Sequence, residues 1–379
     1  MVVELSFINL FRALAAFWVL FAHCMIWGGW YGIPVPSAKI AVDLFMVISG
    51  FLMAANAHAR SSREPLSESI NWVKFWTRRF FRIAPAYYLS LLIAIVLGKH
   101  FLGGYSALQE LNPEAWGSGG VYDPQRISYT FKNIIYHITF VFGLHPYYSF
   151  STFLPDWSLS LEMQFYFAFP ALWILLRRFG LSYAALLVGI GAFLVGVEVS
   201  RRIPFYEPSL LLFKINYFIA GIVLHRALYE PRAAKRLFYV GISVVLCALD
   251  WRYGRELMVL PSLVLLMSYL GIMEVKGRSP QIISRLMNGK GVHFASNASY
   301  GVYLFHGFFI SAAGLIIKSS PALRSVSAPV RVLLIIIFVL PLAYVTAHYV
   351  FKWIEKPGVD MGKRALAILD RKRSASTET

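Results

Sequence analysis

The first apolar segment of the chain contains an arginine and a histidine, in the stretch RALAAFWVLFAH at residues 12–23. At about 100° per residue, the path from Arg12 to His23 makes about three helical turns, so both side chains share one helix face, about 16 Å apart along the axis. An ionisable side chain in a spanning helix costs free energy and normally faces a cavity or a partner, which makes this pair a candidate site. The structural alternatives are that Arg12 extends to the lipid headgroups and that His23 is a neutral core residue bonded to a backbone carbonyl.

Two carboxylates occur at a similar depth in other apolar segments. Asp43, in AVDLFMVISGFLMA, and Glu162, in DWSLSLEMQFYFAFP, are expected about 9 Å and about 8 Å below the outer surface. A neutral histidine can take a proton from a hydroxyl while a carboxylate orients its ring. We therefore predict general acid–base catalysis by His23, Asp43 and Glu162. The alternative for Asp43 is a structural ion pair with a buried basic residue such as Lys214.

Two more arginines begin the third apolar segment, in TRRFFRIAPAYYLSLL. Arg79 and Arg82 are three residues apart and can face one side of a helix, so with Arg12 they predict a basic funnel at the cytoplasmic end of the bundle. Such a funnel suits a phosphate-bearing ligand, because arginine binds phosphate through charge-assisted hydrogen bonds. The alternative is that these arginines only anchor the helix at the cytoplasmic surface.

Polar and small residues recur at helical spacing in other spans. Ser158 begins a polar stripe of spacing four that continues through Glu162, and Tyr303 and His306 share one face of ASNASYGVYLFHGFF. Interhelical hydrogen bonding is the structural alternative for these residues. Gly50, which lies on the same face as Asp43, permits close approach of another backbone or of a ligand.

The composition excludes a soluble domain of this length. Hydrophobic residues make up 58% of the 379 residues, charged residues 15%, and the mean hydropathy is +0.60. These values indicate a polytopic, all-α membrane bundle. The net charge of +17 does not indicate a nucleic-acid partner, because the basic residues concentrate in short loops between apolar runs. Cys24 and Cys247 show neither a disulfide framework nor metal-ligand spacing, so we expect no metal site.

Apolar runs long enough to cross a membrane predict ten spans. Lys and Arg are more frequent in the loops after the even-numbered spans and in the tail, which predicts that both termini are cytoplasmic. The loop 102–156 is then an outer, folded cap, with an interfacial or re-entrant helix near 128–145. We expect a transmembrane domain over residues 1–356 and a basic cytoplasmic tail over 357–379, of which a turn or two contacts membrane lipid. The spans are expected near residues 6–27, 37–56, 81–101, 157–177, 181–199, 208–228, 236–251, 257–274, 297–317 and 330–353.

Taken together, these segments resemble bacterial membrane acyltransferase family 3, the integral-membrane O-acyltransferases that modify surface and secreted glycans. The resemblance rests on the arginine–histidine spacing of the first span and on AVDLFMVISGFLMA, RFFRIAPAYY, WSLSLEMQFYFAFP, SYGVYLFH and KWIEKP. It extends from residue 5 to about 358, although residues 180–290 match only in hydropathy. The family often has two acidic residues in the fourth-span motif, whereas here Met163 follows Glu162, so the carboxylate role is placed on Glu162 alone.

The resemblance implies transfer of an acyl group, usually acetyl from acetyl-CoA, to a sugar hydroxyl. By resemblance His23 is the catalytic residue, acting as a base or as a transient acyl carrier, and Arg12 is its paired motif residue. Arg79 and Arg82 are the expected contacts of the CoA phosphates, and Tyr303 is added to this donor site.

The acceptor is expected to be a glycan or a lipid-linked glycan that enters from the outer side. There Trp157 is placed to stack against a sugar, and Ser158 and His306 complete the predicted acceptor site. The expected location is the bacterial inner membrane. A transporter or flippase for a lipid-linked sugar is the main rival, because a polar track can also pass a solute. It predicts interrupted helices in two repeat halves, which the sequence does not show. A polar-cored scaffold or receptor is the second rival.

Overall fold

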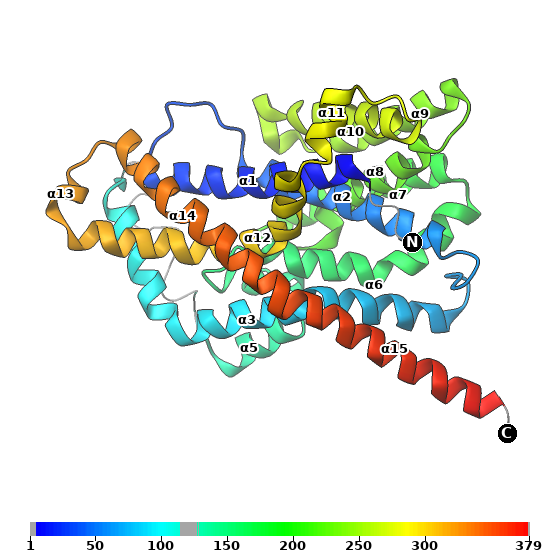
Figure 1. Ribbon diagram of the computed structural model, residues 1–379, viewed down its shortest axis with the longest axis horizontal. Helices are drawn as coiled ribbons and strands as arrows, with labels where there is room; N and C mark the ends of the chain where they lie inside the picture. Colours follow the sequence, from blue (N-terminus) through cyan, green and yellow to red (C-terminus); the bar gives the residue numbers. More distant parts are fainter. Residues whose placement is uncertain (1–4, 114–126, 128, 378–379) are drawn as a thin grey trace.

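The computed structural model describes residues 5–113, 127 and 129–377, and every regular element in these ranges is a helix (Figure 1). In this part of the chain eight helices are long and apolar enough to cross a membrane. The protein is therefore a multi-pass, all-α membrane bundle, as the composition predicts. These helices are α1 (Ser6–Gly28), α2 (Ala38–Ala59), α3 (Ser69–Glu110), α6 (Trp157–Arg178), α7 (Leu181–Arg202), α10 (Val259–Val275) with the helical residues before it from Gly254, α12 (Lys290–Ser319) and α14 (Ala328–Val350) with its continuation.

Two of the ten predicted spans are shorter than expected. The helix α8 (Ile215–Leu228) has 14 residues and α9 (Ala233–Cys247) has 15. At a rise of about 1.5 Å per residue, each is shorter than a hydrocarbon core of about 30 Å. The count of ten spans is therefore not confirmed. By contrast, α3 is longer than the predicted span and reaches Glu110, so the connection predicted to begin at residue 102 begins later.

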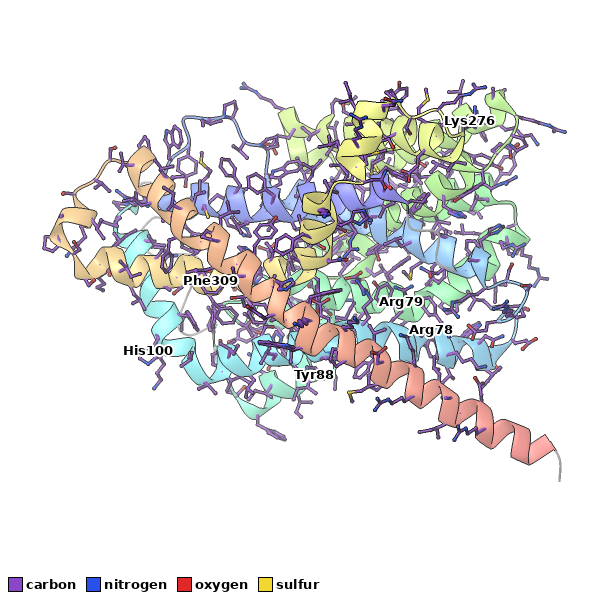
Figure 2. All side chains as sticks on the ribbon, viewed as in Figure 1. Arg78, Arg79, Tyr88, His100, Lys276 and Phe309 are labelled. Atoms are coloured by element: carbon purple, nitrogen blue, oxygen red, sulfur yellow. The ribbon has the colours of Figure 1, made fainter. Side chains whose placement is uncertain are left out.

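The two ends of the described chain lie on the same side of the bundle. In Figure 1 the start of α1 and the end of α15 lie on the right, and the connection between α1 and α2 lies on the left. Figure 2 shows Arg78 and Arg79 in the right half and His100 in the left half, so α3 runs from one side towards the other. That the right-hand side is cytoplasmic remains a prediction.

The last two helices form one long diagonal rod in Figure 1. Between α14 and α15 (Lys356–Thr377) the chain makes a single π-helical turn at Phe351–Glu355. Lys74 on α3 pairs with Asp370 on α15 at 2.5 Å. The tail is thus a continuous helix, which is longer than the turn or two expected from its sequence.

The described part of the predicted cap packs against α3 and the start of α6 (Figure 1). It contains α5 (Phe131–Ile138), within the range predicted for an interfacial helix, whereas residues 114–126 and 128 of the predicted cap lie outside the described residues. The buried Tyr87 hydroxyl donates to Asp156 Oδ2 at 3.0 Å and hydrogen-bonds with His137 Nδ1 at 2.7 Å. This buried polar cluster joins α5 to α3 and to the start of α6.

A close helix contact in the bundle core joins α2 to α8 through two glycines. A Cβ atom at Gly50 would lie 1.9 Å from the Phe218 carbonyl oxygen, and one at Gly221 would lie 1.9 Å from the Val47 carbonyl oxygen. Both distances are shorter than any van der Waals contact, so the two backbones touch only because these residues lack side chains. The approach predicted for Gly50 is thus to another backbone.

We expect Gly221→Ala to destabilise the protein by about 1–3 kcal/mol, because the added methyl group must push α8 away from α2. Thermal unfolding in detergent would measure the loss. Gly241→Ala on α9 is the matched control, since a Cβ there meets nothing within 4 Å. Equal stability of the two variants would contradict the packing argument.

Candidate active site

A cavity of about 140 Å³ lies within the bundle and is lined by α1, α2, α3, α6, α8 and α12. Its wall combines apolar side chains, such as Phe45, Met46 and Phe218, with a set of polar groups contributed by five of these helices. The polar lining residues are Arg12, Ser49, Arg79, Arg82, Ser158, Glu162, Tyr166, Ser299, Tyr300 and Tyr303.

The three arginines of the predicted funnel all line this cavity. Arg12 Nη2 donates a hydrogen bond to Ser299 Oγ at 3.0 Å, which joins α1 to α12. The Arg79 guanidinium carbon lies 5.5 Å from the centre of the Tyr166 ring, a cation–π distance. Arg79 Nε is buried without a hydrogen-bond partner among the described residues, so this guanidinium retains an unused donor.

The neighbouring arginine on α3 has a different environment. Arg78 donates to both carboxylate oxygens of Glu64, at 2.6 and 3.3 Å, and does not line the cavity. Burial opposes ionisation of Glu64, but the hydrogen bonds and charges of Arg78 and Arg60 outweigh it, so the pKa of Glu64 lies below its usual value. Arg78 is thus neutralised by its own carboxylate, whereas Arg79 remains available to a ligand.

Glu162 lies in the cavity with the arginines. It accepts hydrogen bonds from Ser49 Oγ at 3.1 Å and from the Tyr166 hydroxyl, four residues along the same helix. The polar stripe predicted for α6 therefore lines the cavity, and Glu162 is an acidic residue in the same lining as the three arginines. It does not contact His23.

The ring partner of His23 is a second histidine. His23 Nδ1 and His306 Nε2 are 2.7 Å apart, the two rings are stacked with centroids 5.0 Å apart, and His306 Nδ1 lies 3.0 Å from the Val302 carbonyl oxygen. A carbonyl can only accept, so neutral His306 carries its proton on Nδ1 and accepts at Nε2. His23 must then donate from Nδ1. Its Nε2 consequently bears a lone pair, the state that a base requires.

Tyr303 connects the cavity with the histidine pair. Its hydroxyl lines the cavity wall beside Ser158 Oγ at 2.8 Å, and its ring centre is 6.4 Å from that of His306. Tyr303 and Ser158, predicted on different sites, thus belong to one hydrogen-bonded pair between α12 and α6. This pair links two levels of the bundle: the arginine level, at Arg12, Arg79 and Arg82, and the histidine level, at His23 and His306.

Asp43 lies in a separate buried ion cluster. Lys214 Nζ is 2.9 Å from Asp43 Oδ2 and 3.2 Å from Asp250 Oδ2, and the Tyr217 hydroxyl donates to Asp250 at 3.3 Å. All three charged side chains are almost completely buried. The ion pair with Lys214, considered as the alternative from the sequence, is therefore present. Asp43 does not line the cavity, and the hydrogen-bond partner of His23 is His306 instead of Asp43.

The three groups predicted at one depth thus have three different sets of neighbours. His23 meets His306, Asp43 meets Lys214, and Glu162 meets the cavity hydroxyls, because depth along a helix does not fix the direction in which a side chain points. Trp157 gives a second example: it is buried and outside the cavity lining, whereas the adjacent Ser158, rotated by about 100°, lines it.

Sequence reasoning missed one acidic residue near the arginines. Glu355 lies in the quoted segment KWIEKP but two residues beyond the predicted end of the last span, where a charge is ordinary. It is only 1% exposed. The signal available in the sequence was an acidic side chain directly after a long apolar run.

Comparison with known proteins gives a consistent result. A family model described as an acyltransferase domain matches residues 5–348. Peptidoglycan O-acetyltransferase OatA of Listeria monocytogenes is 24% identical over 289 residues, which are 70% of this chain and 44% of that protein. Exopolysaccharide production protein ExoZ of Rhizobium meliloti is 26% identical over 289 residues, 73% of this chain and 78% of ExoZ.

O-acetyltransferase OatA of Staphylococcus aureus is 23% identical over 369 residues, 90% of this chain and 56% of that protein. The matches thus span about half the length of the two OatA proteins. No solved structure matches the chain.

If the cluster around Lys214 is structural, Lys214→Met should cost about 3–5 kcal/mol of stability, because two buried carboxylates lose their cation. Thermal unfolding in detergent is the measurement. Lys39→Met, which removes the exposed partner of Glu207, should cost less than about 1 kcal/mol. A Lys214→Met protein of normal stability that had lost its activity would instead indicate that Asp43 takes part in catalysis.

Proposed function

Because the chain belongs to this acyltransferase family, we propose that it is a membrane O-acetyltransferase that moves an acetyl group from acetyl-CoA to a hydroxyl of a cell-surface or secreted glycan. The names of the relatives support a glycan acceptor, since they include a peptidoglycan O-acetyltransferase and an exopolysaccharide production protein. The proposed location is the bacterial inner membrane. The observation that carries the proposal is the arginine-lined cavity connected to a histidine pair.

The arginine level suits the charged part of the donor. The phosphates of CoA need several cationic donors, and Arg12, Arg79 and Arg82 provide them in one apolar-walled cavity. Arg79 still has an unused buried donor, and cation–π contacts with Phe75 and Tyr166 hold its guanidinium in place. In this proposal the head of CoA stays on the cytoplasmic side.

The histidine level suits the reacting end of the donor. From Arg12 to His23 the helix rises about 16 Å, a distance that the extended pantetheine arm can bridge. The thioester would then reach His23 from the cavity, past Tyr303 and Ser158, and the acceptor hydroxyl would approach from the outer side.

In the proposed reaction His23 Nε2 takes the proton of the acceptor hydroxyl as its oxygen attacks the thioester carbonyl carbon. The carbon–sulfur bond then breaks, the acetyl ester forms, and the proton moves from His23 to the departing CoA sulfur. His306 acts through His23: it accepts the Nδ1 proton and so keeps the lone pair on Nε2. Because both rings are neutral in this arrangement, the base is ready before the donor binds.

We expect His23→Ala to lower the rate of acetyl transfer by about 10² to 10⁴, the usual contribution of a general base. His306→Phe should lower kcat at least about tenfold with little change in KM for acetyl-CoA, because His23 then loses the acceptor that fixes its tautomer. His306→Gln, whose amide oxygen can still accept, should recover part of the rate. Transfer of labelled acetyl from acetyl-CoA to membrane glycan is the measurement. Full activity of folded His23→Ala protein would refute the mechanism.

Arg79→Gln should raise KM for acetyl-CoA about tenfold or more while kcat changes little, because a charge-assisted phosphate contact is lost. Arg78→Gln is the matched control: it removes the adjacent arginine, which pairs with Glu64 outside the cavity. Its KM should stay within about twofold of the wild-type value. Parallel effects of the two substitutions would show that only the overall charge of this region matters.

A further inference from the structure

Glu355 is a buried carboxylate for which the proposed reaction has no role. Its side chain is 1% exposed, and neither carboxylate oxygen has a hydrogen-bond partner among the described residues. Burying a carboxylate without partners costs free energy, so a compensating interaction is required. An isolated surface charge at the end of a span would not need one.

The charges that act on Glu355 are those of two cavity arginines, Arg82 on α3 and Arg12 on α1. Both arginines line the cavity, whereas Glu355 is buried outside its lining. Arg82 and Arg12 also repel each other. A negative charge within electrostatic reach of both therefore stabilises an arrangement that two neighbouring cations alone would oppose.

The local backbone explains how an acidic residue reaches this position. Phe351–Glu355 form the π-helical turn between α14 and α15, and such turns occur frequently at functional sites. Directly after the turn, α15 lies tight against α3: a Cβ at Gly358 would be 2.7 Å from Pro85 Cγ, and one at Gly362 would be 2.9 Å from Phe81 Cβ. The extra residue of the turn and the two glycines together hold Glu355 against the segment that carries Arg82.

We propose that Glu355 is a positioning residue, the internal counterion of Arg12 and Arg82, which holds the two guanidinium groups together in the empty protein and limits the affinity of the cavity for anions. This inference rests on the proposed function, because it takes the phosphates of CoA as the anion. Product CoA carries the same phosphates as acetyl-CoA. A carboxylate that opposes phosphate binding therefore favours release of the product as much as it weakens binding of the donor.

The test is equilibrium binding of CoA, dephospho-CoA and pantetheine to the full-length protein in detergent, for wild type and Glu355→Gln. Removing the carboxylate charge should lower the Kd for CoA about tenfold. The gain should be smaller for dephospho-CoA, which lacks one phosphate, and absent for the uncharged pantetheine. In turnover, Glu355→Gln should lower KM for acetyl-CoA and also kcat, because release of CoA becomes slower.

Two further variants serve as controls. Glu355→Asp keeps the charge and should bind CoA within about twofold of wild type. Glu230→Gln removes another buried carboxylate, paired with Arg226 at 2.8 Å and outside the cavity, and should also leave CoA binding unchanged. If Glu355 had only a structural role, Glu355→Gln would lower the stability of the protein, and any change in ligand binding would not depend on the charge of the ligand.

The outcomes separate this inference from the function on which it rests. If wild type binds CoA and folded Glu355→Gln binds it equally or more weakly, the counterion role is wrong while the donor site stands. If neither protein binds CoA but Glu355→Gln binds inorganic pyrophosphate more tightly than wild type does, the counterion role stands and the donor is wrong. If neither protein binds CoA and both bind inorganic pyrophosphate equally or not at all, both assignments fail.

Discussion

Positive charge buried in an apolar bundle is the constraint on which the rest of this structure depends. Arg12, Arg79 and Arg82 share one cavity, and a guanidinium loses much of its hydration there. Each neighbouring element supplies partial compensation: Ser299 accepts a hydrogen bond from Arg12, the Tyr166 ring lies over Arg79, and Glu162 adds a negative charge. The compensation is incomplete, because Arg79 Nε has no hydrogen-bond partner among the described residues.

Compensation of this kind requires helices that are far apart in the sequence to lie close together. The contact of Arg12 with Ser299 joins α1 to α12, and the histidine pair joins the same two helices at the other level. Because one helix pair carries both levels, the distance between them is fixed by helical rise alone. An acyl donor with a charged head and a long neutral arm matches such a site better than a compact anion does.

Much of the bundle could be predicted from the sequence, because apolar runs of about 20 residues have few alternatives in a membrane. The arginines could also be predicted to come together, since their positions put all of them at one end of their helices. The rotation of each helix about its own axis could not be predicted from the sequence. Asp43 and Glu162 were correctly assigned to spans, yet one faces Lys214 and the other faces the cavity. Depth follows from counting residues, whereas direction depends on which neighbours pack around the helix.

The same distinction explains why His306, and not a carboxylate, is the partner of His23. A carboxylate beside His23 would stabilise its imidazolium but would also raise the proton affinity of the resting ring. A neutral histidine, itself fixed by the Val302 carbonyl, orients His23, the proposed base, without adding charge. The negative charges near the cavity are instead found with the arginines, where they balance cations. The bundle thus separates a charged level, at the arginines, from a level at the His23–His306 pair that carries no carboxylate. In the proposed reaction the first would bind the phosphates and the second would transfer the proton.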